Sequence, residues 1–146
     1  MKPIRVLVCD DHTILREGLV ALLAASGDCE VVGQAADGMA AVEMALKLRP
    51  QVVVVDLSMP RLNGIEVVRR LTAELEGVRI LVLTMHSEEE YVVHVVRAGA
   101  SGFLLKDSAG SELLAAVRAL AAGRGYFGGH AAKVLREDQL EADIQG

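Results

Sequence analysis

The sequence predicts an α/β protein: an open, doubly wound parallel sheet of five strands with helices on both faces. Three observations predict it: short unbroken aliphatic runs, stretches of helical spacing between them, and a regular alternation of the two along the chain. Unbroken runs are typical of strands in a parallel sheet, because helices bury both faces of such a sheet. The runs cover residues 4–9, 31–32, 52–55, 80–83 and 103–105.

The segments between these runs place apolar residues three and four positions apart, which puts them on one face of a helix. The inward residues we expect are Leu15, Leu19, Leu22 and Leu23, then Ala41, Met44, Ala45 and Leu48, then Ile65, Val68, Leu71 and Leu75, and finally Leu113, Val117 and Leu120. Local signals mark the helix ends: Gly27 after the first, Arg49 and Pro50 after the second, Asn63 with Glu66 before the third, and Ser87 with Glu90 before the fourth.

Composition restricts the class of protein. The 146 residues are 52% hydrophobic and 24% charged, which suits one folded domain. Fifteen basic residues stand against 20 acidic ones, for a net charge of -5, and aromatic residues make up 3%. Direct nucleic-acid binding is therefore disfavoured. The cysteines, Cys9 and Cys29, form no metal or disulfide pattern, and no apolar run is long enough to span a membrane. We expect a cytoplasmic protein without a membrane partner.

The character of the sequence changes after Gly123. A glycine-rich stretch over 123–129 precedes a polar segment over 138–146 that has no usable periodicity. We therefore expect a folded domain over residues 1–123 and a C-terminal extension or linker over 124–146.

Three carboxylates follow predicted strands: Asp10 and Asp11 after the first, and Asp56 after the third. In a flavodoxin-like strand order, 2-1-3-4-5, the first and third strands are adjacent and these side chains meet at one edge of the sheet. Like charges about 4 Å apart repel by about 4 kcal/mol at an effective dielectric constant near 20. Such a cluster binds a cation, shares protons or stays hydrated, and oxygen ligands favour Mg2+, or Mn2+, over zinc.

Two further residues end the last two strands. Thr84 supplies a hydroxyl and Lys106 a cation beside the expected acidic pocket, a combination that suits a phosphoryl group. A carboxylate there can act as the nucleophile. The alternative for the acids is ordinary loop or helix-capping duty, above all for Asp11, which could cap the first helix.

With these motifs the chain resembles the receiver domain of a two-component response regulator. The matching residues run from about Ile4 to Gly123 and include the Asp-Asp-His sequence at 10–12, the Val-Asp-Leu-Ser-Met-Pro sequence at 55–60, Gly64, Leu83-Thr84, and the Gly-Ala-Ser-Gly-Phe-Leu-Leu-Lys sequence at 99–106. The first and last of these are similar to the NarL/FixJ-type (LuxR-type) transcriptional regulators, whose members usually carry a C-terminal helix-turn-helix domain.

The resemblance implies a role for each matching residue. It implies that Asp56 accepts the phosphoryl group and that Mg2+ is held by Asp10, Asp11, Asp56 and the backbone carbonyl of Ser58. It also implies that Lys106 pairs with phosphoryl oxygens, that Thr84 moves to hydrogen-bond one, and that Phe103 repacks inward with it. Ser58 and His86 occupy positions that can tune phosphoryl lifetime, although an exposed loop histidine is an equal reading of His86.

The resemblance also implies partners. A sensor histidine kinase donates the phosphoryl group, activation produces a homodimer, and DNA is contacted only through a helix-turn-helix domain that we expect beyond this chain. The domain is then not an enzyme, beyond slow self-phosphorylation and autodephosphorylation. Alternatives are a stand-alone receiver acting by protein–protein interaction, a small aspartate-nucleophile phosphatase of the haloacid-dehalogenase type, and a flavin-binding module. The phosphatase is disfavoured because His12 stands where its second acid belongs, and the flavin module because Asp10 and Asp11 repel phosphate.

The residue after Lys106 departs from the pattern of many receivers. Asp107 stands where a proline with a cis peptide before it is common. A cis bond costs about 3 kcal/mol before a residue other than proline. We nevertheless expect the surrounding fold to enforce a cis peptide between Lys106 and Asp107.

Overall fold

A single parallel sheet organises the molecule. The computed structural model describes residues 2–59, 61–85 and 89–127, of which 89–91 only in their backbone. In chain order the elements are β1 (Ile4–Cys9), α1 (Thr13–Ala25), β2 (Cys29–Ala35), α2 (Gly38–Leu48), β3 (Val52–Asp56), α3 (Gly64–Glu74), β4 (Arg79–Thr84), α4 (Glu89–Ala98), β5 (Gly102–Leu105), α5 (Lys106–Ala121) and β6 (Tyr126–Phe127). The strand order is β2-β1-β3-β4-β5-β6, with every neighbouring pair parallel.

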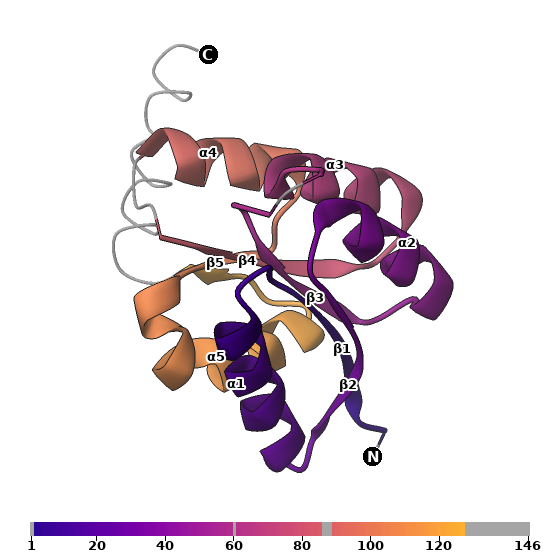
Figure 1. Cartoon of the computed structure of the whole chain (residues 1–146), viewed down its shortest axis with the longest axis vertical. Helices are drawn as coiled ribbons and strands as arrows, with labels where there is room; N and C mark the ends of the chain where they lie inside the picture. Colours follow the sequence, from indigo (N-terminus) through magenta and orange to yellow (C-terminus); the bar gives the residue numbers. More distant parts are fainter. Residues whose placement is uncertain (1, 60, 86–88, 128–146) are drawn as a thin grey trace.

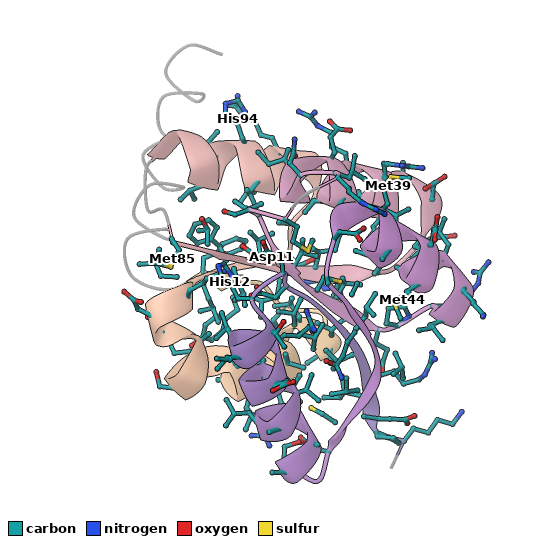
Figure 2. All side chains as sticks on the ribbon, in the orientation of Figure 1. Asp11, His12, Met39, Met44, Met85 and His94 are labelled. Atoms are coloured by element: carbon teal, nitrogen blue, oxygen red, sulfur yellow. The ribbon has the colours of Figure 1, made fainter. Side chains whose placement is uncertain are left out.

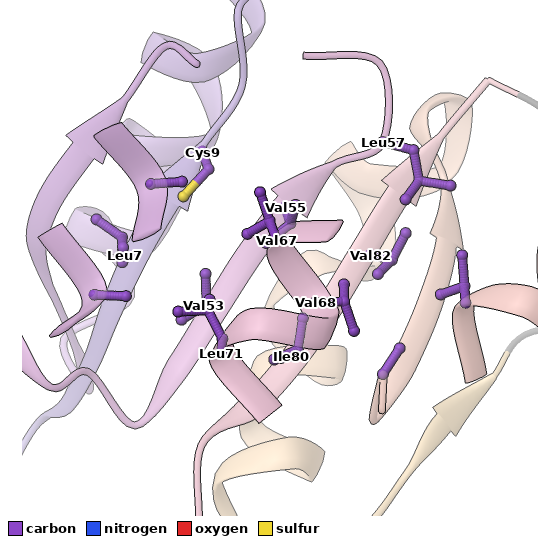
Figure 3. Close-up of a cluster of buried hydrophobic side chains, with 14 of the residues drawn as sticks. Leu7, Cys9, Val53, Val55, Leu57, Val67, Val68, Leu71, Ile80 and Val82 are labelled. Carbon is purple, nitrogen blue, oxygen red and sulfur yellow. The ribbon is translucent and has the colours of Figure 1, made fainter. Parts of the chain in front are cut away.

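Helices cover both faces of this sheet, as predicted. Figure 1 shows α1 and α5 on one face and α2, α3 and α4 on the other. Along β1, Leu7 points toward the α2–α4 layer, whereas Val6 and Val8 point toward the α1–α5 layer. Figure 3 shows part of the first core, in which side chains of β1, β3 and β4 meet those of α3. Because both faces are buried, the central strands carry unbroken aliphatic runs, such as residues 52–55 in β3 and 80–83 in β4.

The predicted helix ends are confirmed where the structure describes them. The Asn63 side chain accepts a hydrogen bond from the backbone N–H of Glu66 and caps α3, and Asp37 caps α2 in the same way. α1 is followed by Gly27 at a φ of 85°, a conformation that glycine adopts without strain. The expected capping box of Ser87 and Glu90 lies outside the described residues. No helix in the described part of the chain is long and apolar enough to cross a bilayer.

The sheet has one more strand than predicted. Tyr126 and Phe127 form β6, which pairs with Gly102 and Phe103 of β5, so the expectation of five strands is corrected to six. Two residues within a glycine-rich stretch carry no periodicity, and their pairing with β5 is a long-range contact that local sequence does not encode. The end of α1 also differs from prediction: Leu22 is exposed, because the buried face of this helix is centred on Leu19 and Leu23.

Candidate functional site

Four of the predicted site residues lie at the carboxyl ends of adjacent strands. Asp10 follows β1, Asp56 ends β3, Thr84 ends β4 and Lys106 follows β5. All four are buried, although each carries a polar or charged group. Strand order explains their convergence, since β1 and β3 are paired neighbours and β4 pairs with both β3 and β5. Polar groups that gather at this edge of a parallel sheet occupy the usual place of a binding site in such folds.

Lys106 joins the two buried carboxylates. Its Nζ lies 3.0 Å from Asp56 Oδ2 and 3.5 Å from Asp10 Oδ2. The ammonium belongs to the first residue of α5, 96 positions after Asp10. No local turn spans that separation, so the contact depends on the whole sheet being formed. One positive charge thus serves at least two buried negative ones.

Asp11 and His12 complete the cluster. His12 is the N-cap residue of α1 and no side chain caps this helix, so the capping alternative for Asp11 is wrong. Ligand atoms of Asp10, Asp11, His12 and Asp56 all lie within 4.8 Å of one another. Figure 2 shows Asp11 and His12 near the start of α1, at the edge of the sheet. The structure therefore brings together the acids that the sequence predicts and adds the imidazole of His12, for which the sequence predicted no role in the site.

The turns after β1 and β3 hold the carboxylates through one oxygen each. Asp10 Oδ1 accepts a hydrogen bond from the backbone N–H of His12 at 2.8 Å, and Asp56 Oδ1 accepts one from the N–H of Ser58 at 3.1 Å. Among the described residues, Asp10 Oδ2 and Asp56 Oδ2 are the buried side-chain oxygens that accept no hydrogen bond. Lys106 attracts both by charge without donating a hydrogen bond to either. Buried acceptors without a donor are costly, by about 1–3 kcal/mol each.

This arrangement fits a divalent cation. Asp10, Asp11 and Asp56 contribute three negative charges when ionised, against the single ammonium of Lys106. Asp10 Oδ2, a carboxylate oxygen of Asp56 and the Asp11 carboxylate, which is one-third exposed, form a set of hard oxygen ligands open to water on one side, which suits Mg2+. The backbone carbonyl of Ser58, predicted as a further ligand, belongs to the turn that holds Asp56.

A glycine positions the end of β3. Gly64 begins α3, and its N–H donates to the carbonyl of Leu57 at 3.1 Å. A Cβ on Gly64 would lie 2.5 Å from Leu57 Cα and 2.8 Å from the Asp56 carbonyl oxygen. Only glycine therefore allows α3 to start this close to the strand end that carries Asp56.

Thr84 ends β4 and Phe103 lies within β5, and their expected roles in a switch stay predictions. Thr84 pairs with Leu105 in the sheet, next to Lys106. Phe103 is already packed inside the core between β4 and β6, with Val82 and Phe127 as its sheet neighbours. The peptide between Lys106 and Asp107 is not cis, since the described residues contain no cis peptide bond, so that expectation is wrong. Without a proline the trans form is favoured by about 3 kcal/mol, and β5 leads directly into α5 through it.

The sequence singles out two further residues, His86 and Cys9. His86 lies outside the described residues, so its suggested influence on phosphoryl lifetime stays a prediction. Cys9 directly precedes Asp10 and is completely buried; burial, with the neighbouring Asp10 charge, raises the pKa of its thiol far above the ordinary value. Cys9 is therefore a core residue and not a second nucleophile in this pocket.

An apolar groove opens beside the acidic cluster. It has a volume of about 510 Å³ and is lined by His12, Ile14, Leu15, Met85, Lys106 and Asp107. Ile14 is 86% exposed and Met85 is 63% exposed, the two highest values among the large hydrophobic side chains of the described residues. Figure 2 shows Met85 on the same side of the molecule as His12. The groove leads from solvent to the residues that surround Asp56.

Comparison with known proteins gives a consistent result. The profile of the response regulator receiver domain matches residues 6–118. The chain is 42% identical over 124 residues to the transcriptional regulatory protein DegU of Brevibacillus brevis, an alignment that covers 85% of this chain and 52% of DegU. It is 39% identical over 132 residues to the DNA-binding transcriptional activator DevR/DosR of Mycobacterium tuberculosis, covering 90% of this chain and 61% of that protein. The chain thus spans little more than half the length of these relatives.

Solved structures share the fold. A two-component response regulator of the LuxR family from Aurantimonas sp. SI85-9A1 is 34% identical, with a TM-score of 0.87 over 95% of this chain and 99% of the other. The isolated receiver domain of RcsB from Salmonella enterica serovar Typhimurium, in the presence of the phosphomimetic BeF3-, is 27% identical with a TM-score of 0.82, covering 91% of this chain and 99% of that one.

Proposed function

The chain belongs to the response regulator receiver domain family, and from this premise we propose that it is a phosphorylation-controlled switch whose phosphoacceptor is Asp56. The observation that carries the proposal is the pair of buried aspartates around Lys106, each with one oxygen that accepts no hydrogen bond. A fold does not keep such groups for stability, since apolar residues there would pack at lower cost. They fit a site that acquires its missing charge and ligands when it works.

The proposed reaction is phosphoryl transfer from a phosphohistidine of a sensor kinase. Asp56 Oδ2, the oxygen without a hydrogen bond, attacks phosphorus; the new O–P bond forms as the P–N bond breaks, and its electron pair stays on the donor imidazole. Lys106 Nζ, 3.0 Å from that oxygen, faces the charge of the incoming phosphoryl oxygens. Mg2+, held by Asp10, Asp11, Asp56 and the Ser58 carbonyl, supplies charge neutralisation and alignment of the phosphoryl group when bound.

The groove beside the pocket supports the proposed partner. A donor histidine must approach Asp56 from the solvent side, and the apolar groove containing Ile14 and Met85 lies along that approach. Contiguous apolar surface rimmed by polar groups marks interaction sites, and here Ile14, Leu15 and Met85 lie together beside polar residues of the pocket. We assign the groove to the kinase helix that carries the phosphohistidine, with Ile14 and Met85 as its apolar contacts.

The proposed output begins at Thr84 and Phe103. A dianionic phosphoryl group on Asp56 gives the Thr84 hydroxyl a new acceptor. Thr84 pairs with Leu105 of the neighbouring strand β5, and Phe103, two residues before Leu105, follows the movement of Thr84. Phe103 contacts β6 through the sheet, so the change reaches the segment that continues into residues 124–146. By analogy with its relatives, the domain over 1–123 controls transcription through dimerisation and a DNA-binding domain beyond this chain; a stand-alone receiver that acts on another protein is the alternative.

Phosphoryl mapping tests the proposal. Acetyl phosphate with Mg2+ should produce one phosphoryl adduct by intact-mass measurement, which peptide mapping places on Asp56. The Asp56→Asn variant should give no adduct, whereas Asp28→Asn, which alters an exposed aspartate far from the pocket, should react like the wild type. An adduct on Asp56→Asn, or no adduct on the wild type with either acetyl phosphate or a phosphorylated histidine kinase, would refute the assignment. Multiple turnover of a phosphomonoester would indicate a phosphatase instead.

A further inference from the structure

His12 is the member of the site cluster to which no role has been assigned. Its ring comes from the residue directly after the aspartate pair, at the N-cap of α1. The hydrogen bond from the His12 N–H to Asp10 Oδ1 fixes the turn, and the turn directs the ring into the pocket. The position of the imidazole is therefore a consequence of the same local structure that holds Asp10.

The imidazole lies among the carboxylates. Its Nδ1 is 3.1 Å from Asp10 Oδ1, 3.4 Å from Asp11 Oδ1 and 3.9 Å from Asp56 Oδ2, and 2.9 Å from Lys106 Nζ. The Lys106 ammonium can only donate, so Nδ1 accepts a hydrogen bond from it and carries its lone pair inside the cluster of carboxylates. No other ring nitrogen of the described residues takes part in this cluster.

The ring and the acids differ in freedom to move. The His12 side chain is 60% exposed, whereas Asp10 and Asp56 are fully buried. The imidazole can swing toward solvent without opening the core, but the two carboxylates cannot leave. An ion that enters the pocket therefore either displaces the imidazole or takes it as a ligand, and the chemistry of the ion decides which.

We propose that His12 sets the metal preference of this site, opposing Mg2+ and favouring divalent ions that accept nitrogen ligands, such as Ni2+. The inference rests on the proposed function only in placing the cation among Asp10, Asp11 and Asp56. Mg2+ takes oxygen ligands and keeps water, so it gains nothing from the ring and must displace it, which breaks the hydrogen bond between His12 and Lys106. Ni2+ accepts imidazole together with carboxylate, so it retains His12 as a fourth protein ligand.

The proposal predicts changes of opposite sign in a single variant. In His12→Ala, the Mg2+ association constant should rise by roughly two- to tenfold, the equivalent of one net hydrogen bond no longer opposed. The Ni2+ association constant should fall by at least about tenfold, because a ligand is lost. Both are measured by isothermal titration calorimetry at one fixed pH.

Two further variants separate ligation from space filling. His12→Phe keeps a ring at the N-cap but no nitrogen, so it should lose Ni2+ affinity as His12→Ala does. His94→Ala removes an exposed histidine of α4 outside the cluster and should change neither constant. Ring signals of His12 in 1H–15N spectra should broaden with paramagnetic Ni2+ and should move toward the free-histidine position with Mg2+.

The ion-binding constants of the His12 variants can support or refute the inference. Opposite changes for the two ions in His12→Ala, with Ni2+ binding lost in His12→Phe, support the inference. Equal changes for both ions, or Ni2+ affinity that survives both variants, overturn it. Phosphorylation of Asp56 in His12→Ala would keep the proposed function intact in that case, and failure of the wild type to be phosphorylated would leave the calorimetric comparison valid by itself.

Discussion

Two contacts in this protein pair aspartate with a basic residue of α5, and they differ in burial and in hydrogen bonding. Asp28, between α1 and β2, meets Arg118 of α5 at the surface: Arg118 Nε donates to Oδ2 at 2.8 Å and its NH2 group donates to Oδ1 at 3.1 Å. Both side chains are about half exposed. Asp10 and Asp56 meet Lys106 inside the protein, where each keeps one oxygen without a hydrogen bond.

The difference separates a structural contact from a functional one. At the surface, two donors satisfy both oxygens of Asp28, water screens the charges, and the geometry is complete without any other group. In the pocket, charges outnumber their partners and the fold holds them in an unsatisfied state. Both oxygens of the Asp28 carboxylate accept a hydrogen bond, whereas Asp10 and Asp56 each keep one oxygen that can take the cation or the phosphoryl group of the proposed function. Three changes test this contrast, from the largest expected effect to the smallest.

Removal of Lys106 should have the largest effect on stability. In Lys106→Met, the buried carboxylates of Asp10 and Asp56 lose their only ammonium, and the free energy of unfolding should fall by about 3 kcal/mol. Urea unfolding followed by circular dichroism measures the change. Mg2+ should restore more stability to this variant than it adds to the wild type, because the cation binds the native pocket and replaces the missing charge.

Arg118→Met serves as the matched control, since it removes a cation from an exposed aspartate. Its unfolding should respond to Mg2+ as the wild type does. If Lys106→Met and Arg118→Met lose the same free energy of unfolding, the buried charges of the pocket depend on their cation no more than the surface charge does. That result would contradict the proposed difference between the two regions.

Neutralising one pocket aspartate should have the opposite sign. Asp10→Asn keeps an oxygen that can accept from the His12 N–H but removes one of the three carboxylates that lie within 4.8 Å of one another, so stability without metal should rise by about 1 kcal/mol. Lys106 still pairs with Asp56 in this variant. Thermal unfolding with and without Mg2+ measures the effect. A variant that is less stable without metal, or that gains as much from Mg2+ as the wild type, would contradict the reading of Asp10 as a strained metal ligand.

The same contrast explains what the sequence could predict. Aliphatic runs foretold β1, β3, β4 and β5 because both faces of these strands are buried, and acids directly after such runs foretold the pocket. β2 was foreseen only at 31–32 although it spans Cys29–Ala35, because an edge strand that is partly exposed includes Gly33 and Gln34 and has no unbroken run.

The missed features depend on particular three-dimensional contacts. The direction of the His12 ring follows from the turn in which its N–H bonds to Asp10, and nothing in the spacing of histidines along the chain announces it. The Asp-Asp-His sequence was the available signal. β6 exists because β5 offers an unpaired edge at Gly102 and Phe103, which only the assembled sheet reveals. The cis peptide after Lys106 was wrong because the pattern of other receivers was carried to a residue that is not proline.

The smallest effect belongs to Asp28, and it depends on pH. Hydrogen bonds from Arg118 lower the pKa of Asp28 from 3.8 to about 2 in the folded protein. A depressed native pKa means that the contribution is complete above about pH 4 and is lost as the pH falls toward 2. Asp28→Asn should therefore lower the melting temperature slightly at pH 7, and the gap to the wild type should narrow between pH 4 and pH 2.5. If the difference in melting temperature between Asp28→Asn and the wild type stays constant over this range, the contribution of Asp28 does not depend on its charge. The surface pair would then be no electrostatic counterpart to the pocket.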